Sequence, residues 1–182
     1  MSETIKKKGI LTATIATALL LMAPAILSTG AFAIDPTSTT RDGGLHFVRG
    51  SPDLTANDGT LTATGEVAGA GTGGEAILTA TASVTTGCLT NEPKGNPGGG
   101  QNEPTGQREQ ESTVTGSATF ETDNGRGTFT VTTDEVTIDD FDADCPSANM
   151  TPVLVGDDVS FSNIVLTIEA QTGTITATFP DQ

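Results

Sequence analysis

The sequence predicts an all-β fold, an antiparallel two-sheet sandwich of about eight strands, from three observations. First, apolar and polar residues alternate with a period of two over several stretches, as in half-buried strands. Second, Thr and Gly are abundant, whereas no long helical periodicity occurs after the N-terminal segment. Third, turn signals such as Asn57-Asp58-Gly59 and Asp123-Asn124-Gly125 separate the alternating stretches. A β-barrel is the alternative arrangement of the same strands.

The clearest predicted strand covers residues 76–88, and the rest of the fold is organised around it. Its outward positions are mostly Thr and Ser, which favour a pleated, half-exposed surface. The strand ends at Cys88, where a long Gly- and Pro-rich stretch begins. The inward positions are Ala76, Leu78, Ala80, Ala82 and Val84.

Further strands follow from the same alternation. Residues 114–120 and 128–132 flank the turn at 123–125 and predict a β-hairpin. The alternation changes phase near Asn163, which predicts a β-bulge or bend. Other strands are expected at 45–48, 60–67, 136–138, 151–155, 159–168 and 175–179.

Residues 1–33 have the pattern of a secretory signal peptide: three lysines, an apolar stretch, and the small-x-small site Ala31-Phe32-Ala33. A rival interpretation is that Lys7-Lys8-Gly9 resembles the processing site of type IV pilin-like precursors, in which the apolar segment is retained for assembly. No later stretch approaches the ~20 apolar residues of a membrane-spanning helix, so we expect no membrane span in the mature chain.

The sequence after this segment is predicted to form one domain. Residues 34–44 are polar and Thr-rich, which predicts a flexible leader. Residues 45–182 are the predicted β-sandwich domain. Within it, residues 89–111 are nearly free of apolar side chains and are predicted to be one long surface loop, which is either functional or disordered at that length.

The charge balance excludes some partners. The formal net charge is -15, and removing residues 1–33 leaves five Lys and Arg against 22 Asp and Glu. Such an acidic surface repels nucleic acid and anionic lipid, so neither is an expected partner. Solubility, a salty exterior or divalent cations are compatible with it.

The two cysteines and the single histidine carry the next expectations. Two cysteines in an exported chain most often pair, which predicts a Cys88–Cys145 disulfide. The histidine, His46, is expected on the outward face of a strand. A secreted hydrolase with a site near His46 stays open, although no Gly-x-Ser-x-Gly motif supports it.

Candidate ligand-binding residues lie in two stretches. Carboxylates at close spacing can gather around Ca²⁺, so calcium is the one expected cofactor, although none is required. The predicted calcium ligands are Asp139, Asp140, Asp142 and Asp144. The amides of the long loop donate and accept hydrogen bonds and form a candidate binding loop. They are Asn91, Asn96, Gln101 and Asn102.

A set of short motifs resembles a group of small exported microbial proteins. That group has a Cys-Thr-Asn loop with Gly-Asn-x-Pro and Gly-Gln-Asn, followed by a Cys-Pro-x-x-Asn-Trp segment; here Met150 replaces the aromatic residue. The resemblance implies an exported β domain with a disulfide, and it transfers no catalytic residue. The matching residues here are Cys88, Asn91, Gly95, Asn96, Pro97, Gly100-Gln101-Asn102 and Cys145-Pro146-Ser147-Ala148-Asn149.

These patterns together predict a secreted or cell-surface β-sandwich without a catalytic constellation, which acts as a structural or binding module. Its expected partners are a surface glycan, a peptide or a second copy. Two alternatives remain open: a filament subunit, pilin-like or exchanging strands with its neighbours through the leader, and the secreted hydrolase.

Overall fold

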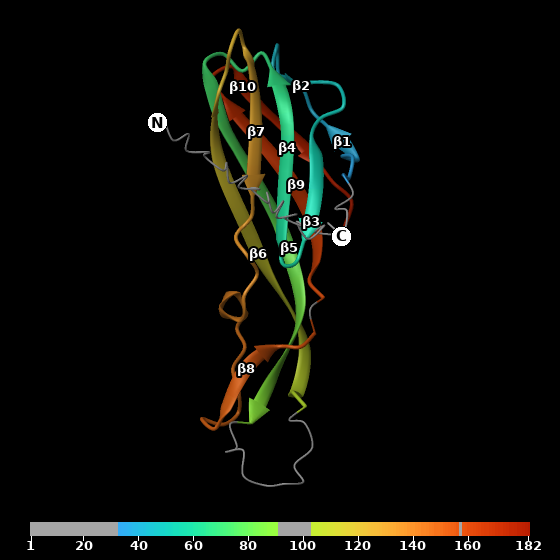
Figure 1. Cartoon of the computed structure of the whole chain (residues 1–182), viewed down its shortest axis with the longest axis vertical. Coiled ribbons are helices and arrows are strands. Elements are labelled where there is room, and N and C mark those ends of the chain that lie inside the picture. Colours follow the sequence, from blue (N-terminus) through green and yellow to red (C-terminus); the bar gives the residue numbers. More distant parts are fainter. Residues whose placement is uncertain (1–32, 91–102, 157) are drawn as a thin grey trace, which may run out of the picture.

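The structure is a computed structural model, and it describes residues 33–90, 103–156 and 158–182. These residues form two antiparallel sheets that share one apolar core, which confirms the predicted all-β, two-sheet fold. The molecule is elongated: most strands form a sandwich at one end, and a narrow extension of the larger sheet projects from it (Figure 1). The elements in chain order are β1 (Ser38–Thr39), β2 (His46–Phe47), β3 (Asp53–Asn57), β4 (Thr60–Ala68), β5 (Gly73–Thr90), β6 (Thr105–Glu121), β7 (Arg126–Thr132), the 3-10 helix η1 (Ile138–Asp140), β8 (Met150–Leu154), β9 (Ser160–Ala170) and β10 (Gly173–Thr178).

The larger sheet has the strand order β1-β10-β9-β5-β6. The 18-residue strand β5 pairs with β6 along one side. Along its other side it pairs first with β9 and then, nearer its end, with β8. In the smaller sheet, β4 is the central strand: β2 and β3 pair with it on one side of the sheet and β7 on the other.

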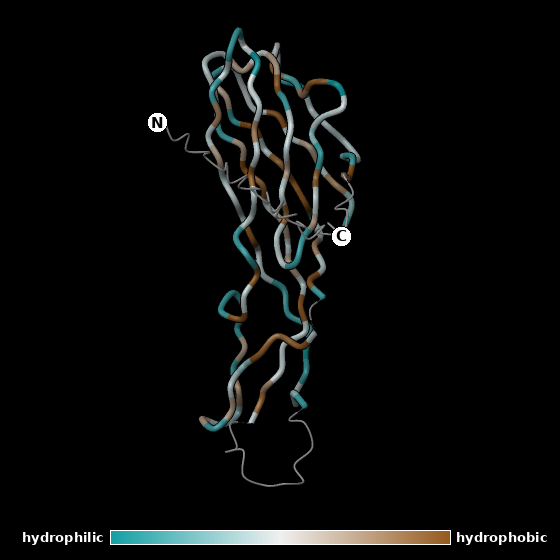
Figure 2. Tube along the Cα trace, in the orientation of Figure 1, coloured by the Kyte–Doolittle hydropathy of each residue, from teal (hydrophilic) through white to brown (hydrophobic). Residues whose placement is uncertain are grey.

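The core lies between the sheets and is built from alternate strand residues. The five predicted inward residues of β5 are all buried, which confirms the alternation there. The large aliphatic side chains of the other strands, such as Leu61 of β4 and Leu166 of β9, are fully buried against them. Each such burial contributes about 1.5–3 kcal/mol. In Figure 2, hydrophobic and polar residues alternate along the strands in the same way.

The turn predicted between residues 120 and 128 is present, but the predicted hairpin is wrong. Asn124 and Gly125 both have positive φ, as in a type I′ turn. Beyond the turn, β6 pairs with β5 in the larger sheet, whereas β7 pairs with β4 in the smaller one. Because both strands bury one face, Phe120 and Phe129 meet across the core, with ring centroids 6.3 Å apart. The chain therefore crosses between the sheets here.

The phase change near Asn163 is a β-bulge, as predicted. Thr79 of β5 lies opposite Val165, and Thr81 lies opposite Ser162, so two residues of β9 face one residue of β5. Asn163 has a φ of 52°, a backbone conformation that Asn adopts more readily than most residues. The extra residue restores the inward orientation of Ile164, which is fully buried.

The predicted loop over residues 89–111 is wrong at both ends. β5 continues to Thr90, and β6 begins at Thr105, so the last seven residues of the predicted loop belong to a strand. Gln110 lies opposite Val84, and Arg108 lies opposite Thr86. These polar side chains are largely exposed on a solvated extension of the sheet, and backbone pairing holds them there. The polar composition of residues 105–111 reflects their exposure to solvent, and it does not indicate the absence of a strand.

The predicted flexible leader, residues 34–44, is also corrected by the structure. Ile34 pairs with Leu54 at the edge of the smaller sheet. The chain then crosses to the larger sheet, where the amides of Thr37 and Thr40 donate to carbonyl oxygens of β10 at 2.8 Å each. The segment therefore spans one open side of the sandwich and is held at both edges.

Residues 136–138, predicted as a short strand, form none. Val136 is buried and its amide bonds to the carbonyl oxygen of Gly59, after which the chain turns into η1. Over the described ranges, no helix is long and apolar enough to cross a membrane.

Candidate functional site

The two cysteines form the predicted disulfide near the tip of the extension. Cys88 and Cys145 are joined with their Cα atoms 5.9 Å apart, across 57 residues of sequence. Cys88 lies in β5, and Cys145 lies in the segment that precedes β8, so the bond ties this segment to the long strand. Closing a loop of this length stabilises the folded chain by about 4 kcal/mol on the chain-entropy estimate.

The four predicted calcium ligands lie on the segment 139–144, which leads from η1 to Cys145, and all four are exposed. The Asp140 carboxylate accepts hydrogen bonds from the backbone amide and the hydroxyl of Thr137, at 2.6 and 3.0 Å. The backbone oxygen of Asp142 accepts from the side chains of Arg108 and Gln110. Among the described residues, no three His, Cys, Asp or Glu side chains are grouped to hold a metal. Calcium binding stays a prediction.

The candidate binding-loop residues Asn91, Asn96, Gln101 and Asn102 lie outside the described residues. The strand ends that carry this loop are described. Thr105, at the start of β6, lines a small pocket of about 140 Å³ together with Cys88 and Asp144. Thr105 at the start of β6 and Asp144 of the acidic segment are therefore close together, as expected from the predicted disulfide.

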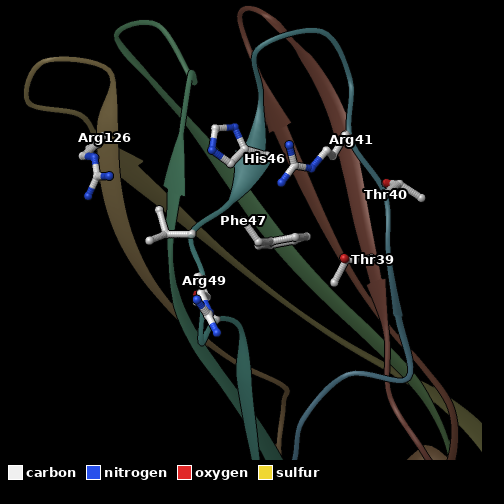
Figure 3. A pocket seen from close by; sticks show the side chains of 9 residues that line it. Thr39, Thr40, Arg41, His46, Phe47, Arg49 and Arg126 are labelled. Atoms are coloured by element: carbon white, nitrogen blue, oxygen red, sulfur yellow. The ribbon is translucent and has the colours of Figure 1, made fainter.

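A second candidate site was missed by the sequence analysis: an open groove of about 540 Å³ on the sandwich, between β1 and β2. We call it the basic groove. Three of the five cations in residues 34–182 line it. Figure 3 shows Arg41 reaching from the β1 side toward His46 and the ring of Phe47. The lining residues are Thr39, Thr40, Arg41, His46, Phe47, Val48, Arg49, Ser51 and Arg126.

Backbone hydrogen bonds hold both walls of the basic groove. On one side, β1 pairs with β10. On the other side, β2 pairs with β4, and the amide of Val48 donates to the carbonyl oxygen of Glu66 at 2.9 Å. A tight turn connects the walls, with reciprocal backbone bonds between Asp42 and Leu45. Phe47 anchors β2 through an edge-on contact with Phe129, with ring centroids 6.4 Å apart.

The nearby carboxylates leave most of this positive charge unpaired. Arg126 pairs with Glu66 at 2.9 Å. The carboxylate of Asp42, next to Arg41 in sequence, accepts instead from the backbone amide of Thr174 at 3.1 Å. Within the described part of the chain, Arg126–Glu66 is the single ion pair, so neither Arg41 nor Arg49 has a carboxylate within 4 Å there.

His46 lies in the groove without a catalytic partner in the described residues. Its Nδ1 donates to the carbonyl oxygen of Gly44 at 2.8 Å, since that oxygen can only accept. The hydroxyl of Ser51 accepts from the backbone amide of Glu66 at 2.7 Å. A nucleophile–histidine–carboxylate arrangement is therefore not formed around His46 by the residues described.

No family model, no curated protein and no solved structure matches this chain. The resemblance to small exported microbial proteins therefore stays a prediction.

Proposed function

We propose that this protein is an exported β-sandwich that acts without catalysis at or outside the cell surface, as a structural or binding module. The observation that carries the proposal is the Cys88–Cys145 disulfide. Structural disulfides form and persist in oxidising compartments, and they are rare in a reducing cytosol. The signal-like segment at residues 1–33 supports the same compartment.

The shape of the molecule suits a module that presents its ends. The sandwich supplies a rigid base, and the β5–β6 extension projects from it (Figure 1). The disulfide and β8 brace this extension near its tip. Binding residues commonly lie on loops that a rigid scaffold positions, so a surface glycan, a peptide or a second copy are the partners we propose for the tip.

The two alternative functions have weaker support. A filament built by strand exchange through residues 34–44 must first detach that segment from its own sheets, where Ile34, Thr37 and Thr40 are hydrogen-bonded. A hydrolase at His46 needs a carboxylate partner for the imidazole, and its Nδ1 bonds to the Gly44 carbonyl oxygen instead.

Protease accessibility of the producing cells tests the proposed location. With intact cells, external protease should remove the protein, or the protein should appear in the medium, while a cytosolic marker stays protected. Ala33→Arg is the matched variant, because an arginine at the expected cleavage site should leave an uncleaved precursor in the membrane fraction. Recovery of the unmodified protein in the cytosol with both thiols free would contradict the proposal.

A further inference from the structure

We propose that the basic groove binds a small ligand through a carboxylate or phosphate group, with Arg41 and Arg49 as the residues that pair with it. This inference rests on the groove itself. It is independent of the export and surface role proposed above, and each can fail without the other.

Positive charge is concentrated in the basic groove. The chain beyond residue 33 carries five Lys and Arg against 22 Asp and Glu, yet three of the five cations line one groove. At physiological ionic strength charges are screened over about 8 Å. An anion in the groove therefore responds mainly to the lining, which contains these three arginines and no Asp or Glu, and to the few carboxylates next to it, such as Asp42 and Glu66. The groove is therefore a local positive site on an acidic molecule.

Arg41 and Arg49 form no ion pair within the described residues. Asp42, next to Arg41 in sequence, accepts from the amide of Thr174, and Glu66 pairs with Arg126. Over residues 33–90, 103–156 and 158–182, Arg41 and Arg49 have no carboxylate within 4 Å. A guanidinium group presents a planar fork of donors that matches carboxylate and phosphate oxygens.

The backbone of the basic groove is already held in place before a ligand binds. Hydrogen bonds of β1 to β10 and of β2 to β4 fix the backbone on both sides of the groove. Binding then orders mainly the exposed arginine side chains, which lowers the entropy lost on association. Thr39 and His46 also line the groove, and they bring two further hydrogen-bonding groups, the Thr39 hydroxyl and Nε2 of His46. Figure 3 shows the Thr39 hydroxyl on the Phe47 side of β1.

The size of the groove and the overall charge of the protein favour a small ligand. A volume of about 540 Å³ lies within the usual range of small-molecule sites. A long polyanion such as nucleic acid would be repelled by the rest of the surface. A sugar acid and a phosphorylated small molecule share the required oxyanion chemistry.

Amide chemical-shift titration of the purified protein tests the site at residue resolution. The probes are glucuronate and inorganic phosphate, with glucose as the uncharged control, all at constant ionic strength. We expect saturable shifts with at least one of the two anions, centred on residues 39–51 and 126, and none with glucose. Binding of glucuronate alone indicates a carboxylate ligand, and binding of phosphate alone indicates a phosphorylated one. No saturable shift with either anion would overturn the proposal.

Charge variants identify the binding residues. Arg41→Gln and Arg49→Gln should each weaken binding at least about tenfold, since a hydrogen bond to a charged group contributes about 1.5–3 kcal/mol. Arg108→Gln removes the same charge from β6, outside the groove, and should leave the affinity unchanged. Glu66→Gln frees Arg126 and should tighten binding. An equal loss of affinity in Arg108→Gln would contradict the assignment. The assignment would also be wrong if Glu66→Gln brought no gain in affinity and the Arg41 and Arg49 variants showed no loss. Should Arg41→Gln fail to fold, Arg41→Lys replaces it as the test. Lysine keeps the charge without the planar guanidinium group, so we expect an intermediate affinity.

Discussion

His46 and Arg126 lie on opposite sides of the same residue, Ala68. His46 of β2 pairs with Ala68 of β4 across one edge, and Arg126 of β7 pairs with it across the other. Paired residues on adjacent strands project from the same face of a sheet, so these two side chains form one row with a small alanine between them. The basic groove is thus a consequence of strand register, because residues 80 positions apart are brought to one level of the smaller sheet.

Loss of the disulfide should destabilise the extension before the sandwich. Cys145→Ser is expected to lower stability by up to about 4 kcal/mol, because it removes a closed loop of 57 residues. Hydrogen exchange should accelerate first in β8 and at the end of β5, which the disulfide ties together. Cys88→Ser is the matched variant and should behave alike, and the double variant should be no worse than either single one. Unchanged exchange in β8 would contradict this assignment.

The buried hydroxyl of Thr133 should contribute more to stability than the exposed hydroxyl of its neighbour Thr132. Thr133 is 4% exposed, and its hydroxyl accepts a hydrogen bond from the backbone amide of Leu61 at 3.0 Å. Thr133→Val leaves that buried amide without this partner, at an expected cost of about 1–3 kcal/mol in unfolding free energy. Thr132→Val removes an exposed hydroxyl–hydroxyl hydrogen bond with Thr62 at 3.0 Å and should lower stability by less than about 1 kcal/mol. Denaturant unfolding measures both, and equal losses would argue against the role of Thr133.

β6 and the end of β7 approach each other closely at Gly116. A side chain there would collide with the carbonyl oxygen of Thr132, so β6 and the end of β7 can approach only because residue 116 has no Cβ. Gly116→Ala is expected to lower the unfolding free energy by about 1–3 kcal/mol through overpacking. Gly44→Ala is the control, since nothing lies within 4 Å of a Cβ added there. Comparable melting temperatures for the two variants would show that the strands do not meet in this way.

Calcium binding by the acidic segment is tested by titration. We expect weak binding, with a dissociation constant of ~10⁻⁴ to 10⁻³ M, as in extracellular modules. Millimolar Ca²⁺ should then raise the melting temperature, and the rise should be absent in Asp140→Asn and in Asp142→Asn. No calorimetric heat and no thermal shift would leave Asp139, Asp140, Asp142 and Asp144 as solubilising charges.

Local patterns in the sequence predicted what depends on local structure. The alternation in β5, the turn at Asn124-Gly125 and the bulge at Asn163 all follow from the preferences of neighbouring residues. The two cysteines of a chain predicted to be exported also sufficed to predict their bond. These features needed no knowledge of which strands pair.

Pairing partners could not be read from a period of two. Alternation shows which face of a strand is buried, and it leaves open whether the next strand joins the same sheet or the opposite one; this is why β6 and β7 were assigned to a hairpin. The basic groove was missed for the same reason. Arg41, Arg49 and Arg126 are three of the five cations after residue 33, but only the register around Ala68 brings Arg126 to the same level of the sheet as His46.

The mass of the protein isolated from its producing cells, with and without reductant, tests the account most directly. We expect a chain that begins at Ile34, because the proposed cleavage follows Ala33, and a gain of two hydrogens on reduction, because Cys88 and Cys145 are joined. A chain that begins at Ile10 would indicate pilin-like processing with retention of the apolar segment. An uncleaved chain whose mass does not change on reduction would contradict export and the disulfide together.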